Sequence, residues 1–250
     1  MGCFLSLGSA QTAELMAAAG YDWALIDLEH GAGDERDALA QMQALATRRC
    51  IAIVRVESNA RQRVHRVLDF GAQGIMFPRI DTQEGAEAAV AAMRYPPAGV
   101  RGVAFSNRAC EYGSNFRPYL EGSASLLTII QIESPTAFKN AEAIAAVDGV
   151  DVLFVGPSDL SHSMGMLGNF EHPDFVSAVR RTAQAALSHG KYCGILLPSP
   201  RDLKVYLDLG YRFVASGSDA VLLNNAAKSL VQSLQKNLVE SERHDGLSQR

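Results

Sequence analysis

The sequence predicts a single-domain (β/α)8 barrel, and three observations support that fold class. Eight short apolar runs recur along the 250 residues, helical segments lie between them, and no linker rich in proline, glycine or serine interrupts the alternation. Such alternation predicts a parallel sheet covered by helices, and eight units in this length are typical of a closed barrel. We expect one domain over residues 1–250, with a polar tail from about residue 236. An open doubly wound sheet is the alternative, but "LGSAQTAE" after the first run lacks the usual GxGxxG pattern.

The expected strands are mostly continuous apolar runs, as in strands buried on both faces of a parallel sheet. They span residues 3–7, 23–27, 51–56, 74–78, 126–133, 152–156, 192–197 and 212–217. The start of the chain, "MGCFLS", also matches the myristoylation pattern. Because an acylated terminus is incompatible with a strand inside a barrel, we interpret this segment as the first strand.

The expected helices show apolar residues at helical spacing and recognisable end signals. Gly20 is a C-cap candidate, Thr82 precedes acidic residues in a first turn, and Pro135 follows Ser134 at a helix start. These helices span residues 9–20, 59–71, 82–94, 134–147, 172–190, 199–210 and 218–241. The longest irregular stretch, residues 95–121, is long enough to indicate a functional loop.

Composition excludes several classes of protein. Hydrophobic residues make up 48% and charged residues 20%, which suits a globular chain with a sizeable core. The net charge is −4 and the basic residues form no cluster, so we expect no nucleic-acid partner. The apolar runs are too short to span a bilayer. Four scattered cysteines without CxxC spacing predict neither a disulfide scaffold nor a zinc site, and they favour the cytoplasm: Cys3, Cys50, Cys110 and Cys193.

Polar side chains follow several of the expected strands, where a barrel places its active site. We expect them to meet at one mouth although they are distant in sequence: Asp27, Glu29, His30, Arg55, Gln131, Glu133, Ser158 and Asp159. Each also has a structural explanation. Glu133 and Asp159 suit helix N-termini, and Arg55 suits a buried salt bridge.

The two carboxylates Glu133 and Asp159 follow adjacent strands, and such a pair with water suits a hard cation such as Mg²⁺ or Mn²⁺. A metal ion beside an arginine suits a 2-oxo acid, because the cation chelates its oxygens and the developing enolate is stabilised electrostatically. The lysines lie in helical segments or before a strand, so Schiff-base chemistry is disfavoured.

Asp69 lies at the end of an expected helix, where a carboxylate is unfavourably placed against the helix dipole. It therefore needs a specific partner, for which His30 is the candidate. A histidine held by an aspartate can move a proton. Asp27 and Glu29 are secondary candidates, either around metal-bound water or as hydrogen-bond partners of the loop.

Five segments resemble the HpcH/HpaI aldolase family: "AAAGYDWALIDLEHG", "LDFGAQGIMFPRI", "YPPAGVRG", "QIESPTAFKNAEAIAAVDGVDVLFVGPSDLSHSMG" and "ASGSDAVLL". The resemblance covers nearly the whole chain, and the "QIE" and "GPSDLS" pair is its most specific part. It implies a metal-dependent (class II) pyruvate aldolase on a (β/α)8 barrel. It also implies a homohexamer in which the last helix is exchanged between subunits.

The resemblance also implies roles for individual residues. The metal-binding acids fall on Glu133 and Asp159, the pyruvate-binding arginine on Arg55, and a histidine–aspartate dyad on His30 and Asp69. Substrate contacts fall on Gln131, and on Gly156 with Ser158, whose loop amides hold the pyruvate carboxylate. The loop "SNRACEYGSNFRPYL" lies where members of the family differ widely, and it is expected to contribute to the choice of aldehyde.

We therefore predict a cytoplasmic carbon–carbon lyase that uses Mg²⁺, Mn²⁺ or Co²⁺. It reversibly cleaves 4-hydroxy-2-oxo acids to pyruvate, or a related 2-oxo acid, and an aldehyde through a metal-bound enolate. Two alternatives stay open at this point. Decarboxylation of oxaloacetate uses the same enolate site, and a catalytically silent barrel would only bind a small molecule.

Overall fold

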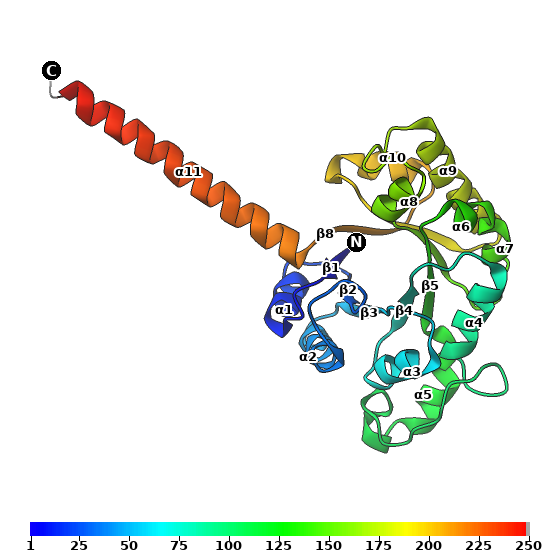
Figure 1. The fold of residues 1–250 in the computed structure, drawn as a ribbon. Helices are drawn as coiled ribbons and strands as arrows, with labels where there is room; N and C mark the ends of the chain where they lie inside the picture. The colour runs from blue at the N-terminus through cyan, green and yellow to red at the C-terminus, as the bar shows by residue number, and fades with distance from the viewer. Residues whose placement is uncertain (249–250) are drawn as a thin grey trace.

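A computed structural model describes residues 1–248, with side chains described through residue 240. Eight parallel strands close into a barrel in sequence order, and helices surround it (Figure 1). The strands are β1 (Gly2–Leu5), β2 (Trp23–Asp27), β3 (Ile51–Arg55), β4 (Gly74–Phe77), β5 (Leu127–Ile132), β6 (Val152–Val155), β7 (Tyr192–Leu196) and β8 (Phe213–Ser218). The predicted (β/α)8 fold is confirmed, and each predicted strand occurs within two residues of its expected bounds.

The strands are apolar on both faces because the barrel has an inner and an outer core. The inner cluster draws only on strand residues: Phe4, Trp23, Leu25, Ile53, Met76, Ile129, Val152, Phe154 and Ala215. The larger cluster lies between strands and helices. Because side chains alternate along a strand, the residue two places after an inward one also points inward. Asp27 and Arg55 follow Leu25 and Ile53 in this way, so they point into the barrel at the ends of β2 and β3.

The helices around the barrel begin with side-chain caps at several of the predicted positions. Ser9, Thr82 and Ser134 each accept a backbone hydrogen bond at the start of a helix. The helices are α1 (Ala10–Ala18), α2 (Glu35–Ala46), α3 (Arg61–Asp69), α4 (Gln83–Met93), α5 (Phe116–Gly122), α6 (Pro135–Lys139), α7 (Ala141–Ala145), α8 (Pro157–Ser163), α9 (Pro173–Ser188), α10 (Leu203–Asp208) and α11 (Asp219–Ser248).

Several helices differ from the sequence expectation. α2, α5 and α8 are not predicted from the sequence, and the helix expected over residues 134–147 is divided into α6 and α7 at Asn140. α2 begins with a capping box in which Asp34 and Asp37 bond each other's backbone N–H groups. The stretch expected to be irregular contains α5 and a short 3-10 helix, η1 (Arg108–Gly113).

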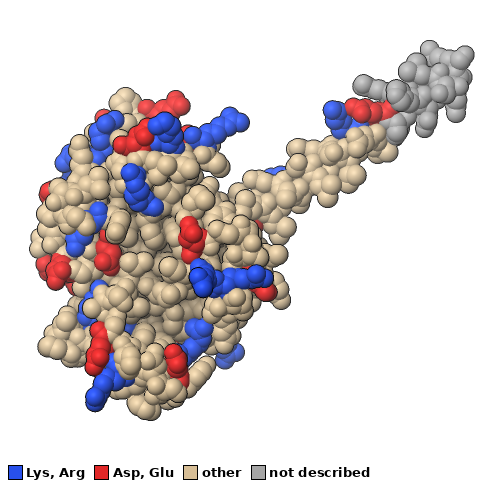
Figure 2. Space-filling view, turned by 180° about the vertical axis from the view of Figure 1, so that it is seen from behind, with Lys and Arg blue, Asp and Glu red and all other residues tan. Residues whose placement is uncertain are grey.

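The last helix, α11, projects away from the barrel (Figure 1). Asp219 at its start is buried and accepts hydrogen bonds from Ser6 N–H (2.8 Å) and the Thr12 hydroxyl (2.8 Å), which ties the helix to β1 and α1. Much of its described surface carries no charge (Figure 2). The helix runs through most of the expected tail, and residues 249–250 lie outside the described residues.

Two further sequence expectations concern the membrane and the cysteines. Among the described residues, none of the helices combines the length and hydropathy that a membrane span requires. All four cysteines lie in the described part of the chain, and each is free and buried.

Candidate active site

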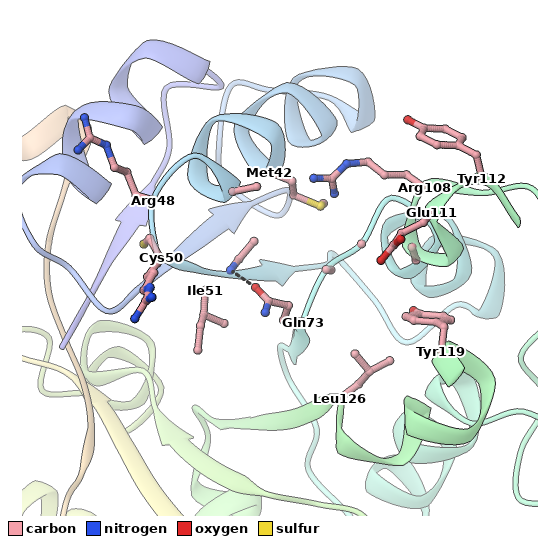
Figure 3. A pocket seen from close by; sticks show the side chains of 16 residues that line it. Met42, Arg48, Cys50, Ile51, Gln73, Arg108, Glu111, Tyr112, Tyr119 and Leu126 are labelled. Carbon is pink, nitrogen blue, oxygen red and sulfur yellow. Dashed lines mark hydrogen bonds between the residues drawn. The ribbon is translucent and has the colours of Figure 1, made fainter. Parts of the chain in front are cut away.

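Two of the cavities lie at opposite ends of the barrel. The larger one, of about 780 Å³, is lined by Ile51, Gln73 and Leu126, which stand at the starts of β3, β4 and β5, and by Arg108 and Tyr119 (Figure 3). The smaller one, of about 260 Å³, lies where the strands end and is lined by Glu29, His30, Arg79, Asp81, Glu133, Ser134, Asp159, His162 and Ser163. Enzymes with this fold carry their chemistry at the C-terminal ends of the strands, so the smaller cavity is the candidate active site.

Arg55 forms a buried ionic network beside this cavity. Its Nε and Nη2 atoms donate to the two carboxylate oxygens of Asp27 at 2.9 and 2.6 Å, and Nη1 lies 3.1 Å from Glu29 Oε2. Burial alone would lower the pKa of Arg55, but the hydrogen bond and charge of Asp27 raise it above the usual value. The network holds a permanent cation at the floor of the site.

Glu133 immediately follows β5, and two groups fix its carboxylate. Gln131 Nε2 donates to Oε1 at 2.6 Å, and the Arg79 backbone N–H donates to Oε2 at 3.2 Å. Burial and the nearby charge of Asp159 raise the pKa of Glu133 to about 7. A Cβ atom on Gly156 would lie 2.6 Å from Oε1, so only glycine leaves room for this carboxylate.

Asp159 lies in the first turn of α8 and lines the same cavity as Glu133. Its side chain makes no hydrogen bond or ion pair within the described residues, and it is exposed toward the cavity that it lines. The part of the chain that the structure describes contains no group of three or more His, Cys, Asp or Glu side chains placed around one ion. Of the four carboxylates that line the mouth, Glu29 is paired with Arg55 and Asp81 accepts a hydrogen bond from Ser134, which leaves Glu133 and Asp159 facing the cavity.

These two carboxylates fit a divalent cation. Burial first, and the nearby charge of Asp159 second, raise the pKa of Glu133, so a negative charge is disfavoured at this place. A hard cation would stabilise that charge, and oxygen donors are the ligands that Mg²⁺ and Mn²⁺ prefer. With two protein ligands, positions remain for water and substrate oxygens.

The structure separates His30 from Asp69, so the pair expected from the sequence is not formed within one chain. His30 lies at the mouth after β2, where its Nε2 is 3.8 Å from Glu29 Oε2 and its side chain is 66% exposed. Asp69 ends α3, which runs from the mouth back to the other end of the barrel, and it accepts a hydrogen bond from Arg101 Nη2 at 2.9 Å. The Asp69 carboxylate, which is unfavourably placed against the helix dipole, is thus paired with Arg101.

The remaining predicted residues lie near the mouth. Gln131 contacts Glu133, Gly156 precedes α8, and Ser158 lies in the first turn of α8 beside Asp159. Five cavity residues are absent from the predicted site: Arg79, Asp81, Ser134, His162 and Ser163. Arg79 lies two residues after the end of β4, so the rule that predicts site residues at strand ends also applies to it.

The fold and the acidic site beside a buried arginine define the chain as a (β/α)8-barrel enzyme. The chain belongs to the HpcH/HpaI aldolase/citrate lyase family, whose model matches residues 1–226. It is 40% identical over 236 residues to a 5-keto-4-deoxy-D-glucarate aldolase of Salmonella arizonae, covering 94% of this chain and 92% of that relative.

Solved structures of the family share the whole fold. An HpcH/HpaI aldolase/citrate lyase family protein of Burkholderia cenocepacia superimposes with a TM-score of 0.89 at 39% identity, covering 94% of this chain and 93% of that chain. An HpcH/HpaI aldolase of Desulfitobacterium hafniense gives a TM-score of 0.88 at 26% identity, covering 94% and 92%. With relatives that are aldolases over nearly the full length, the chain is a carbon–carbon lyase that acts on small molecules.

Proposed function

We propose that the enzyme is a divalent-metal-dependent (class II) aldolase that reversibly cleaves 4-hydroxy-2-oxo acids to pyruvate and an aldehyde. The bond between carbons 3 and 4 breaks, the 4-hydroxyl group loses its proton, and carbon 3 gains one. The observation that carries this proposal is the pair Glu133 and Asp159 beside Arg55. The name of the Salmonella relative makes 5-keto-4-deoxy-D-glucarate the first substrate to test.

Arg55 is the group that holds the 2-oxo acid in this proposal. Its guanidinium has five N–H donors, of which the contacts to Asp27 and Glu29 use three. The two remaining donors can stabilise the oxygen on which negative charge develops, and burial makes this interaction stronger than in water. The backbone amides at Gly156 and Ser158 are the proposed contacts for the pyruvate carboxylate.

Glu133 and Asp159 are the proposed ligands of Mg²⁺, Mn²⁺ or Co²⁺. When bound, the cation would polarise the carbonyl oxygen of the 2-oxo acid and stabilise the charge that develops there. Gln131 holds Glu133 in position through its 2.6 Å hydrogen bond. Glu29 and Asp27 keep Arg55 in place, which is a role that supports the reacting groups without contact with substrate.

His30 is the proposed group that moves the proton, directly or through water. It is exposed at the mouth and has Glu29 as its neighbour. Because Asp69 lies at the opposite end of its own barrel, a His30–Asp69 dyad requires two copies of the chain.

We further propose a homo-oligomer, with the hexamer of the family resemblance as its form. α11 carries exposed apolar side chains such as Leu223 and Leu230 and stands away from its own barrel (Figure 1). A cavity of about 360 Å³ runs along β8, lined by Tyr21, Leu203 and Val214, where an eighth helix would cover the barrel. Exchange of α11 between subunits fills that place. The free, buried cysteines support a cytoplasmic location.

The test is metal-dependent release of pyruvate from 5-keto-4-deoxy-D-glucarate. Chelation should abolish the activity, and Mg²⁺, Mn²⁺ or Co²⁺ should restore it. Glu133→Gln and Asp159→Asn should lose at least about a hundredfold in kcat/KM, because each removes a charged ligand. Glu171→Gln, an acid outside the cavity, is the matched control and should keep full activity. Unchanged turnover after thorough chelation would reject the metal requirement.

A further inference from the structure

Arg79 is held at the mouth in an unusual backbone conformation. It follows β4, lines the candidate cavity, and has a φ of 55°, in the left-handed region that residues other than glycine rarely adopt. In this conformation its N–H reaches Glu133 Oε2 at 3.2 Å. Strained residues of this kind cluster at functional sites, where the surroundings hold them. The backbone of Arg79 is thus anchored on a proposed metal ligand.

The side chain of Arg79 is an unpaired cation among acids. The cavity is lined by the carboxylates of Glu29, Asp81, Glu133 and Asp159. Within the described residues the Arg79 guanidinium nevertheless makes no hydrogen bond, ion pair or ring contact. Glu29 instead lies against Arg55, and Asp81 accepts from the Ser134 hydroxyl at 2.6 Å. All five donors of Arg79 therefore remain available to a ligand.

The two arginines of the site lie on adjacent strands at different depths. Arg55 ends β3 and is only 7% exposed, whereas Arg79 follows β4 and is exposed. Arg79 and the carboxylates line the cavity of about 260 Å³, Arg55 lies beside it against Glu29, and the size suits a short molecule. A 2-oxo acid bound at Arg55 leaves its other end directed toward the opening, where Arg79 stands.

We propose that the Arg79 guanidinium binds a carboxylate at the far end of the substrate, the end that departs with the aldehyde. The enzyme accordingly selects diacids, and in the reverse direction it selects acceptor aldehydes that carry an acid group. This inference rests on the proposed aldolase function and assigns to Arg79 the recognition of the second carboxylate that a diacid such as 5-keto-4-deoxy-D-glucarate carries. An arginine suits this role because its planar fork matches a carboxylate bidentately.

The experiment compares matched aldehydes in the aldol direction with pyruvate. Glyoxylate against acetaldehyde, and succinic semialdehyde against butanal, differ mainly by a carboxylate in place of a methyl group. Arg79→Met should lower kcat/KM for the acidic aldehydes about ten- to a hundredfold, the range of a charge-assisted hydrogen bond, with a much smaller change for the neutral aldehydes. Arg79→Lys keeps the charge and should retain part of the preference.

Arg201→Met controls for the loss of one positive charge at this end of the barrel. Arg201 follows β7 on the same side of the barrel and lies outside the cavity. This variant should keep the full preference. Deuterium exchange of the pyruvate methyl protons is measured in every variant, since it reports the first half of the reaction without an acceptor.

The outcomes are distinct. Exchange in Arg79→Met with an unchanged preference for acidic aldehydes overturns the role of Arg79 and leaves the aldolase proposal intact. No exchange in the unmodified enzyme contradicts the aldolase proposal, and the inference fails with it. Loss of the preference in both Arg79→Met and Arg201→Met would show a nonspecific effect of surface charge and would also overturn the inference.

Discussion

Arg55 and Asp27 form a buried ion pair at the ends of two adjacent strands. Asp27 is 5% exposed, and its Oδ1 atom also accepts from the backbone N–H groups of Glu29 and His30 at 3.1 and 3.2 Å. Burial would raise the pKa of Asp27, but the Arg55 hydrogen bond and charge keep it below the usual value. One carboxylate therefore positions both the arginine and the loop that carries the histidine.

The pair allows stability and catalysis to be tested separately. Arg55→Met should lower the free energy of unfolding by about 3–5 kcal/mol, because it leaves the Asp27 carboxylate buried without a partner. The double variant Arg55→Met/Asp27→Asn should recover much of this loss, since an amide oxygen can still accept from the Glu29 and His30 N–H groups. Urea denaturation measures both values.

Activity should not follow stability in these two variants. The kcat/KM for cleavage should stay at least about a hundredfold below that of the unmodified enzyme in both, because neither supplies donors to the developing negative charge. Full activity in the stable double variant would reject the role of Arg55.

The sequence predicts most residues of the candidate site because strand ends meet at one mouth. Glu133 and Asp159 were found this way, although 26 positions separate them in the chain. The sequence prediction does not include Arg79, although this residue follows the apolar run "GIMFP" at a strand end. Its left-handed φ is a property of the folded chain that residue type does not signal. The partner of Asp69 was also missed, because Arg101 approaches it from a loop 32 residues away.

The sequence pattern of α11 predicts the helix but does not predict what its apolar residues contact. Its apolar residues indicate a helix that packs against another surface. In a single chain, however, the side chains of Leu223, Leu230 and Leu234 are 60 to 62% exposed to solvent. At about 100° per residue these three positions fall on one face. A stripe of this kind is a contact surface when a partner is available. The element was predictable, but what covers it depends on a second molecule.

The stripe predicts the effect of charge on assembly. Leu223→Glu/Leu230→Glu should shift the enzyme toward monomer, because burying two carboxylates at an apolar contact is unfavourable. Lys228→Glu, on a different face of the same helix, is the control and should leave the oligomer intact. Sedimentation velocity measures the distribution. A monomeric unmodified enzyme, or an oligomer unaffected by the double change, would contradict the proposed exchange of α11.

The whole molecule joins a rigid barrel to a small, charged mouth. The strands were predictable because both barrel faces are apolar. α8 was missed because a helix of seven residues carries little periodic signal, whereas α2 was predictable in principle, since its buried residues Ala38, Met42 and Leu45 have helical spacing. A cavity of about 780 Å³, larger than the one at the mouth, lies at the opposite end of the barrel from the candidate site, so size alone does not locate that site. The position of the strand ends does so, since it collects Arg55, Glu133 and Asp159 in one place.

The central claim is that this mouth removes a proton from the methyl group of pyruvate with the help of a divalent cation. The most direct measurement is proton NMR of pyruvate in D2O with the full-length enzyme. The methyl signal should decay with Mg²⁺, Mn²⁺ or Co²⁺ present, stop decaying after chelation, and resume when the metal is returned. A signal that persists with every metal, or exchange that continues unchanged after thorough chelation, would contradict the account.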